Sequence, residues 1–115
     1  MKYFKLEEFD CPCCKQGEMK PEFLVILDNA REMAGVPFRI NSGFRCEKHN
    51  KEVGGKPTSS HLFGYACDIS ADTSYKRYKV LKGLILAGFT RIGIGSNFIH
   101  ADSDSSKPPE ALWLY

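Results

Sequence analysis

The sequence lacks a long hydrophobic run, and it has no strong excess of charge of either sign. Its longest nearly apolar stretch, Phe23 to Leu27, is far shorter than the roughly 20 residues of a helix that crosses a bilayer. Sixteen Lys and Arg residues against fourteen Asp and Glu leave a formal charge of +2, which is too small for a dedicated nucleic-acid binder. Charges interrupt the first ten residues, so no signal peptide is visible. We therefore expect neither a membrane segment nor a nucleic-acid partner.

The composition that is present fits one folded body. The chain has 115 residues, of which 43% are hydrophobic and 12% aromatic, values typical of globular proteins and unlike those of disordered chains. This length is enough for one hydrophobic core and too short for two. We expect residues 1–115 to form a single domain that acts as a monomer.

Periodicity and turn residues predict the order of the elements. Apolar residues at helical spacing predict helices at Pro21–Ala34 and Ser74–Ala87. The Gly- and Pro-containing stretch Glu47–Ser60 predicts an irregular loop. Trp113 could line a cleft, but a single aromatic residue in an edge strand is more often part of the core, where we expect it. Alternating or β-prone runs predict five strands, at Phe38–Ser42, Tyr65–Ser70, Arg91–Ile94, Asn97–Asp102 and Ala111–Tyr115. This order predicts an α+β fold with helices packed on a central, mainly antiparallel sheet.

Two histidines and one aspartate lie where separate elements could bring them together. His61 follows the predicted loop, Asp68 lies in the second predicted strand, and His100 lies in the fourth. Because side chains alternate along a strand, His100 shares a face with Asp102. Two imidazoles and one carboxylate leave the fourth position of a tetrahedral zinc ion open, which is typical of a catalytic site.

The residues around these positions resemble a known family. The segment SSHLFGYACD, residues 59–68, matches the SxHxxGxAxD signature of D-alanyl-D-alanine carboxypeptidase-like (VanY-like) zinc peptidases, which include phage cell-wall endopeptidases. The family's SGxR segment corresponds to residues 42–45, and its His-x-Asp strand to residues 98–102. In order and spacing the resemblance extends from about Phe38 to Asp102.

The resemblance implies a Hedgehog/DD-peptidase-like fold and a zinc metallopeptidase that hydrolyses peptidoglycan peptide bonds involving D-amino acids. It makes His61, Asp68 and His100 the ligands of one catalytic zinc ion. It makes Arg45 the contact for an oxyanion or a substrate carboxylate, and Ser59 a support for the site. The expected partner is the peptidoglycan stem peptide, and the expected role is cell-wall lysis or remodelling, as in phage-type enzymes.

One position departs from the family pattern. Classical members carry a carboxylate three residues before the last histidine as the general base, and this position is Asn97 here. An amide cannot take a proton from water. Asp102 is our candidate for proton transfer, Asp104 is a further one, and the alternative is that Asp102 only orients His100. Asn97 is then a supporting residue. It also favours a second hypothesis, a non-catalytic zinc-containing module that binds cell walls or proteins.

Five cysteines are the other unusual feature, and three of them lie within residues 11–14. Cys11 and Cys14 have the spacing of half a structural zinc site, which Cys46 and His49 would complete. A disulfide to Cys46 and fully reduced thiols are the alternatives, and the sequence leaves all three open. His49 is expected to fix its own loop, and Cys67 to be a small buried hydrophobe.

Overall fold

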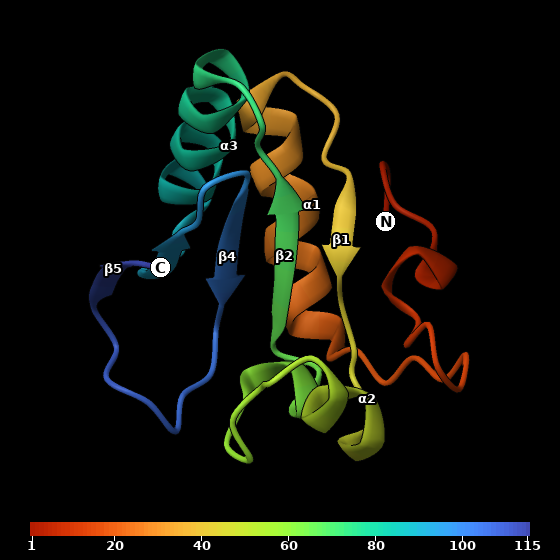
Figure 1. Ribbon diagram of the computed structural model, residues 1–115. Helices are drawn as coiled ribbons and strands as arrows, with labels where there is room; N and C mark the ends of the chain where they lie inside the picture. The colour runs from red at the N-terminus through yellow and green to blue at the C-terminus, as the bar shows by residue number, and fades with distance from the viewer.

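Five strands form one sheet, and two long helices cover one of its faces (Figure 1). The structure is a computed structural model that describes residues 1–115. The strand order is β1-β2-β4-β3-β5, in which only the β3–β5 pair is parallel. This arrangement confirms the predicted α+β class. The strands are β1 (Ile40–Ser42), β2 (Ala66–Ser70), β3 (Arg91–Ile94), β4 (Phe98–Asp102) and β5 (Ala111–Leu114).

The two long helices, α1 (Pro21–Ala34) and α3 (Ser74–Ala87), have the predicted bounds. Proline occupies the first turn of α1, and Gly35 ends this helix at a φ of 70°. The side chain of Thr73 caps α3 by accepting a hydrogen bond from the Lys76 N–H. Gly83 of α3 lies directly against α1, where a Cβ would be 2.6 Å from that of Ala34. The missing side chain therefore lets the two helices pack closely.

The strands confirm the predicted alternation of faces. Cys67 and Ile69 of β2, with Ile99 and Ala101 of β4, are fully buried in the core beneath the helices. The intervening residues, among them Asp68 and His100, project from the opposite face of the sheet. That face carries the polar side chains described below.

The predicted loop at residues 47–60 is more ordered than expected. It begins with a helix, α2 (Glu47–Glu52), and leads into a 3-10 helix, η2 (Ser60–Phe63). The sulfur of Cys46 accepts a hydrogen bond from the backbone N–H of His49 and so caps α2. The loop prediction was wrong for residues 47–52 and correct for residues 53–59, because the Gly and Pro residues that indicated irregular backbone all lie after Glu52.

The N-terminal segment runs along the outer edge of β1 (Figure 1). Its only regular element is a 3-10 helix, η1 (Leu6–Phe9). Phe4 and Phe9 belong to the core, and the Phe9 carbonyl accepts a hydrogen bond from the Phe44 N–H at 2.8 Å. The N-terminal segment therefore packs beside the loop that follows β1. None of the helices combines the length and apolarity needed to cross a membrane.

Candidate metal centre

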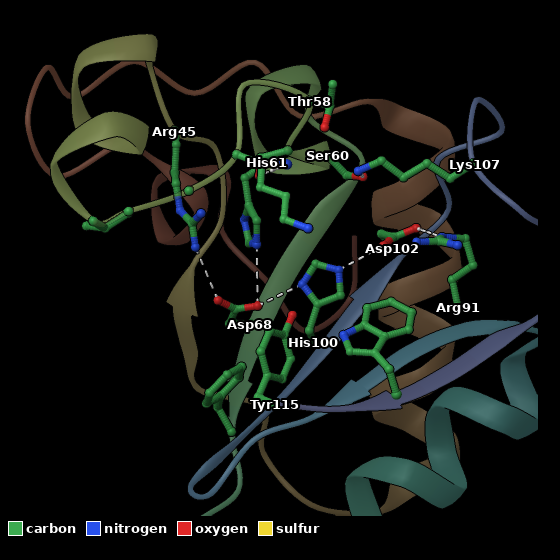
Figure 2. Close-up of a pocket in the computed structure, with 17 residues that line it drawn as sticks. Arg45, Thr58, Ser60, His61, Asp68, Arg91, His100, Asp102, Lys107 and Tyr115 are labelled. Carbon is green, nitrogen blue, oxygen red and sulfur yellow. Dashed lines mark hydrogen bonds and ion pairs between the residues drawn. The ribbon is translucent and has the colours of Figure 1, made fainter.

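Asp68 and His100 lie side by side on adjacent strands and on the same face of the sheet. β2 and β4 are antiparallel neighbours, and their register pairs Asp68 with His100. Figure 2 shows both side chains with His61, which approaches Asp68 from η2. Ligand atoms of the three residues all lie within 4.8 Å of one another. Segments far apart in the sequence are therefore brought to one point.

Local backbone structure places His61. The Ser59 side chain accepts a hydrogen bond from the His61 N–H, and Gly64 ends η2 at a φ of 77°. The His61 ring is buried, and its Nδ1 donates to the Gly43 carbonyl oxygen at 2.8 Å. Because a carbonyl only accepts, the proton is fixed on Nδ1. The lone pair of Nε2 is then directed to Asp68, whose Oδ1 lies 3.4 Å away.

His100 is held by two carboxylates. Its Nε2 is 2.8 Å from Asp102 Oδ2, and its Nδ1 is 3.0 Å from Asp68 Oδ1. Burial alone lowers the pKa of His100, but hydrogen bonds to both aspartates outweigh it and raise that pKa. For Asp68 the directions are reversed: burial raises its pKa, but hydrogen bonds and charge interactions with the two imidazoles outweigh burial and hold that pKa well below its usual range. Positive charge is thus favoured between His61, Asp68 and His100.

The donor set fits a zinc ion. Nε2 of His61, Nδ1 of His100 and a carboxylate oxygen of Asp68 form a two-imidazole, one-carboxylate group of the kind that catalytic zinc prefers. The second nitrogen of each ring is occupied by an acceptor, so each ring has a fixed tautomer. An open cleft of about 450 Å³ lies beside the group and leaves room for a substrate.

Arg45 forms one wall of this cleft. Its Nη2 is 3.4 Å from Asp68 Oδ2, while Nε donates to Ser42 and Nη1 to Asn50. Asn50 is buried and also donates to the Lys56 carbonyl oxygen. These contacts fix the plane of the guanidinium group at the edge of the candidate metal centre.

One comparison with known proteins decides the family. The family model described as Peptidase M15 matches residues 2–102. The chain belongs to the Peptidase M15 family. Among curated proteins, no match was found. The match to the Peptidase M15 family model confirms the family resemblance drawn from the motifs. Membership makes the chain a metallopeptidase of the class that acts on cell-wall peptides.

Asp102 of this M15 peptidase is engaged on both oxygens. It is almost fully buried, and its Oδ1 accepts from Arg91 Nε at 2.6 Å while Oδ2 accepts from His100. Burial raises the pKa of Asp102, but His100 and Arg91 outweigh it and lower that pKa. Asp104, the other candidate for proton transfer, is buried in a network with Ser60 and Ser106, and it does not line the cleft.

Three other predicted positions have different surroundings. Asn97 is exposed in the turn between β3 and β4, and neither it nor His49 lines the cleft of the M15 peptidase. Trp113 was expected in the core, but it lines the cleft with its ring 5.5 Å from that of His100. Gly93, beside His100 in the sheet, makes this possible because a Cβ there would collide with the indole.

Sequence reasoning missed Asn50, Arg91 and Tyr115. Arg91 binds Asp102 and lies over the Trp113 ring, and Tyr115 lines the cleft next to Asp68 in Figure 2. The strand register could have indicated Arg91, because alternation places it opposite Asp102. No local pattern marks Asn50 or Tyr115, whose roles depend on contacts across the fold.

Proposed function

We propose that this M15 peptidase is a zinc enzyme that hydrolyses peptidoglycan peptide bonds involving D-amino acids, in cell-wall lysis or remodelling. The observation that carries the proposal is the convergence of three ligand atoms, from His61, Asp68 and His100, at the cleft. A bound zinc ion would supply Lewis acidity for amide hydrolysis. The resemblance to VanY-like peptidases supports the choice of metal and of D-amino acids.

The chain's own residues hold the ion and keep its ligands in place. His61 would bind through Nε2, His100 through Nδ1, and Asp68 through a carboxylate oxygen. The Gly43 carbonyl and Asp102 fix the two rings from behind. Ser59 supports the site by capping the turn that carries His61.

Arg45 and its neighbours provide the substrate contacts. The fixed guanidinium can donate two parallel hydrogen bonds to a carboxylate, or stabilise a carbonyl oxygen as it gains negative charge. Lys56, Arg91 and Lys107 also line the cleft, whereas Asp68 and Asp102 are its only acidic residues. This excess of positive charge suits stem peptides, which carry free carboxylates.

Asp102 is assigned to positioning in this proposal. Both of its oxygens are engaged, and it contacts the far nitrogen of His100 rather than the open side of the cleft. The sequence-based alternative, in which Asp102 accepts a proton during catalysis, requires it to release one of these partners. The two roles predict different behaviour of an Asp102 variant, as discussed below.

The direct test is release of peptides from purified cell walls. We expect loss of turbidity and new amino termini with the native protein, loss of both on chelation, and recovery with zinc. His61→Ala should abolish zinc retention at this site and activity. The matched control is His49→Ala, because His49 lies outside the cleft and should retain activity. Full activity of His61→Ala would overturn the proposal.

A non-catalytic wall-binding module is the second candidate. The observation that favours it is that no carboxylate lining the cleft is free to act as a base, since Asn97 is elsewhere and Asp102 is engaged. Such a module would sediment with cell walls but release no peptide, with or without zinc. Mass spectrometry of the soluble fraction separates the two candidates.

A further inference from the structure

A second group of metal-binding side chains lies outside the cleft. The sulfur atoms of Cys11, Cys14 and Cys46 are all within 4.8 Å of one another. Cys46 Sγ is 3.7 Å from Cys11 Sγ and 3.6 Å from Cys13 Sγ. Four of the five cysteines therefore gather where the N-terminal segment meets the start of α2.

The spacing of three of these sulfurs, those of Cys11, Cys14 and Cys46, fits a tetrahedral metal site, whereas Cys13 Sγ lies outside this group and contacts only Cys46. A disulfide needs an S–S distance of about 2.05 Å, and all five cysteines are free thiols. In a tetrathiolate zinc site with Zn–S bonds of about 2.3 Å, tetrahedral geometry separates neighbouring sulfurs by about 3.8 Å. The measured 3.6 and 3.7 Å are close to this value.

The backbone around the cysteines also suits a metal site. Lys15 has a positive φ of 61°, and its N–H donates to the Cys11 carbonyl, so the chain turns tightly between Cys11 and Cys14. The His49 N–H donates to Cys46 Sγ at 3.4 Å. Such a hydrogen bond favours the thiolate, which is the form that binds metal.

We infer that Cys11, Cys13, Cys14 and Cys46 bind a second zinc ion, which is structural. Cys11, Cys14 and Cys46 supply three thiolates, and the exposed Cys13 side chain would turn toward them to supply the fourth and close the site. Each protonated thiol releases its proton to solvent when it binds, and nothing is oxidised. Zinc is favoured because thiolates in tetrahedral geometry select it over hard cations such as magnesium and calcium.

The second ion would connect the N-terminal segment to the side of the cleft that Arg45 forms. Residues 1–20 contain only the short helix η1, so few backbone hydrogen bonds hold them. Cys46 directly follows Arg45, whose N–H donates to the His61 carbonyl at 3.1 Å. The ion therefore fixes the loop that carries both Arg45 and Gly43, the acceptor for His61. Structural zinc contributes directly to folding in such short segments.

Metal stoichiometry tests the inference separately from the proposed function. Elemental analysis of the reduced, zinc-loaded protein should give two zinc ions per chain. Cys14→Ser, an exposed position whose replacement leaves the core intact, should reduce this to one. His61→Ala should also reduce it to one, and the double variant should bind none. Cys67→Ala is the control and should keep two, because Cys67 is in the core.

Cobalt substitution identifies which ion is lost. Cobalt bound by thiolates gives intense sulfur-to-metal charge-transfer absorption, which should persist in His61→Ala and vanish in Cys14→Ser. The fourth ligand is tested by chelator competition, in which Cys13→Ser should weaken zinc binding at least tenfold and His49→Ala should not. If His61→Ala keeps its full zinc content while the thiolate absorption is present, the proposed catalytic site fails and the cysteine site stands.

Two results would overturn the inference. One is a single zinc ion per native chain that is lost in His61→Ala and unaffected in Cys14→Ser. The other is a stable disulfide in the protein purified without reductant, seen as a mass lower by two hydrogens and mapped to Cys46, with no thiolate absorption after reduction and cobalt loading.

Discussion

His100 has a different partner on each ring nitrogen, and this asymmetry determines what each aspartate can do. Asp68 faces Nδ1 at the candidate metal centre, whereas Asp102 faces Nε2 and is tied to Arg91. Histidine ligands are generally oriented by such a partner on the second nitrogen. In the proposed function, Asp102 would therefore act on the metal centre through His100.

We predict that Asp102→Asn weakens zinc binding more than it impairs the chemical step. The expected loss of zinc affinity is about 10- to 100-fold, with most activity recovered at saturating zinc. Chelator competition and kcat at high zinc measure the two effects. Asp72→Asn, on the exposed surface, is the control. Normal zinc affinity with lost activity would instead assign the proton transfer to Asp102.

We predict that Arg45→Lys lowers kcat/KM by about 100-fold while zinc content stays unchanged. Lysine keeps the charge but loses the planar fork that binds a carboxylate or oxyanion with two hydrogen bonds. The matched control is Arg39→Lys, because Arg39 is exposed. Unchanged kcat/KM for Arg45→Lys would remove Arg45 from the substrate contacts.

Single residues differed in how far the sequence could predict them. His61, Asp68 and His100 were predicted because each lies in a local motif, and the fold brings them within 4.8 Å. The roles of Asn50 and Tyr115 depend on contacts with distant segments, which no local pattern encodes.

At the scale of elements, η2 is tied to the loop after β4 by a buried polar network. Ser60 donates to Asp104 Oδ2 at 2.7 Å, and Lys107 contacts Ser60 at 2.8 Å. Burial raises the pKa of Asp104, but hydrogen bonds from Ser106 and Ser60 outweigh it and lower that pKa. The ionised carboxylate thus stabilises the turn that presents His61.

This network predicts a specific pH dependence of stability. Since the folded pKa of Asp104 is lowered, its contribution is present above the unfolded pKa of about 3.9 and is lost as pH falls through the folded value. Asp104→Asn should cost about 1–2 kcal/mol at pH 7 and less near pH 3. Urea unfolding at both pH values measures this, with the exposed Glu110→Gln as control. An equal cost at both values would contradict the assignment.

Element prediction succeeded where periodicity was long and failed where tertiary contacts decide. The bounds of α1 and α3 agree with the predicted ranges, because each pattern is 14 residues long and a glycine follows its last residue. The helix α2 was missed because its six residues are too few for a periodic signal, and a cysteine caps it. Trp113 was misplaced because the space left by Gly93 in a neighbouring strand is invisible in the local sequence.

At the scale of the whole molecule, one core joins the N-terminal segment, both long helices and the sheet. Its members extend from Phe4 to Ala101. We therefore predict that residues 1–115 unfold as one cooperative unit and sediment as a monomer. Two separate thermal transitions would contradict the single-domain expectation.

Zinc removal should lower the stability of this unit. At free zinc about 100 times the dissociation constant, binding contributes about 2.7 kcal/mol per site, which corresponds to a Tm difference of roughly 10 °C for each bound ion in a chain of this size. Calorimetry of zinc-loaded and chelator-treated protein measures the difference. Equal Tm values would show that zinc does not bind the native state.

An anomalous difference map of zinc-loaded crystals, recorded on both sides of the zinc absorption edge, tests the central claim most directly. The account predicts a peak about 2.0–2.2 Å from His61 Nε2, His100 Nδ1 and an Asp68 carboxylate oxygen. A map of the zinc-loaded protein with no peak between these three side chains would contradict it.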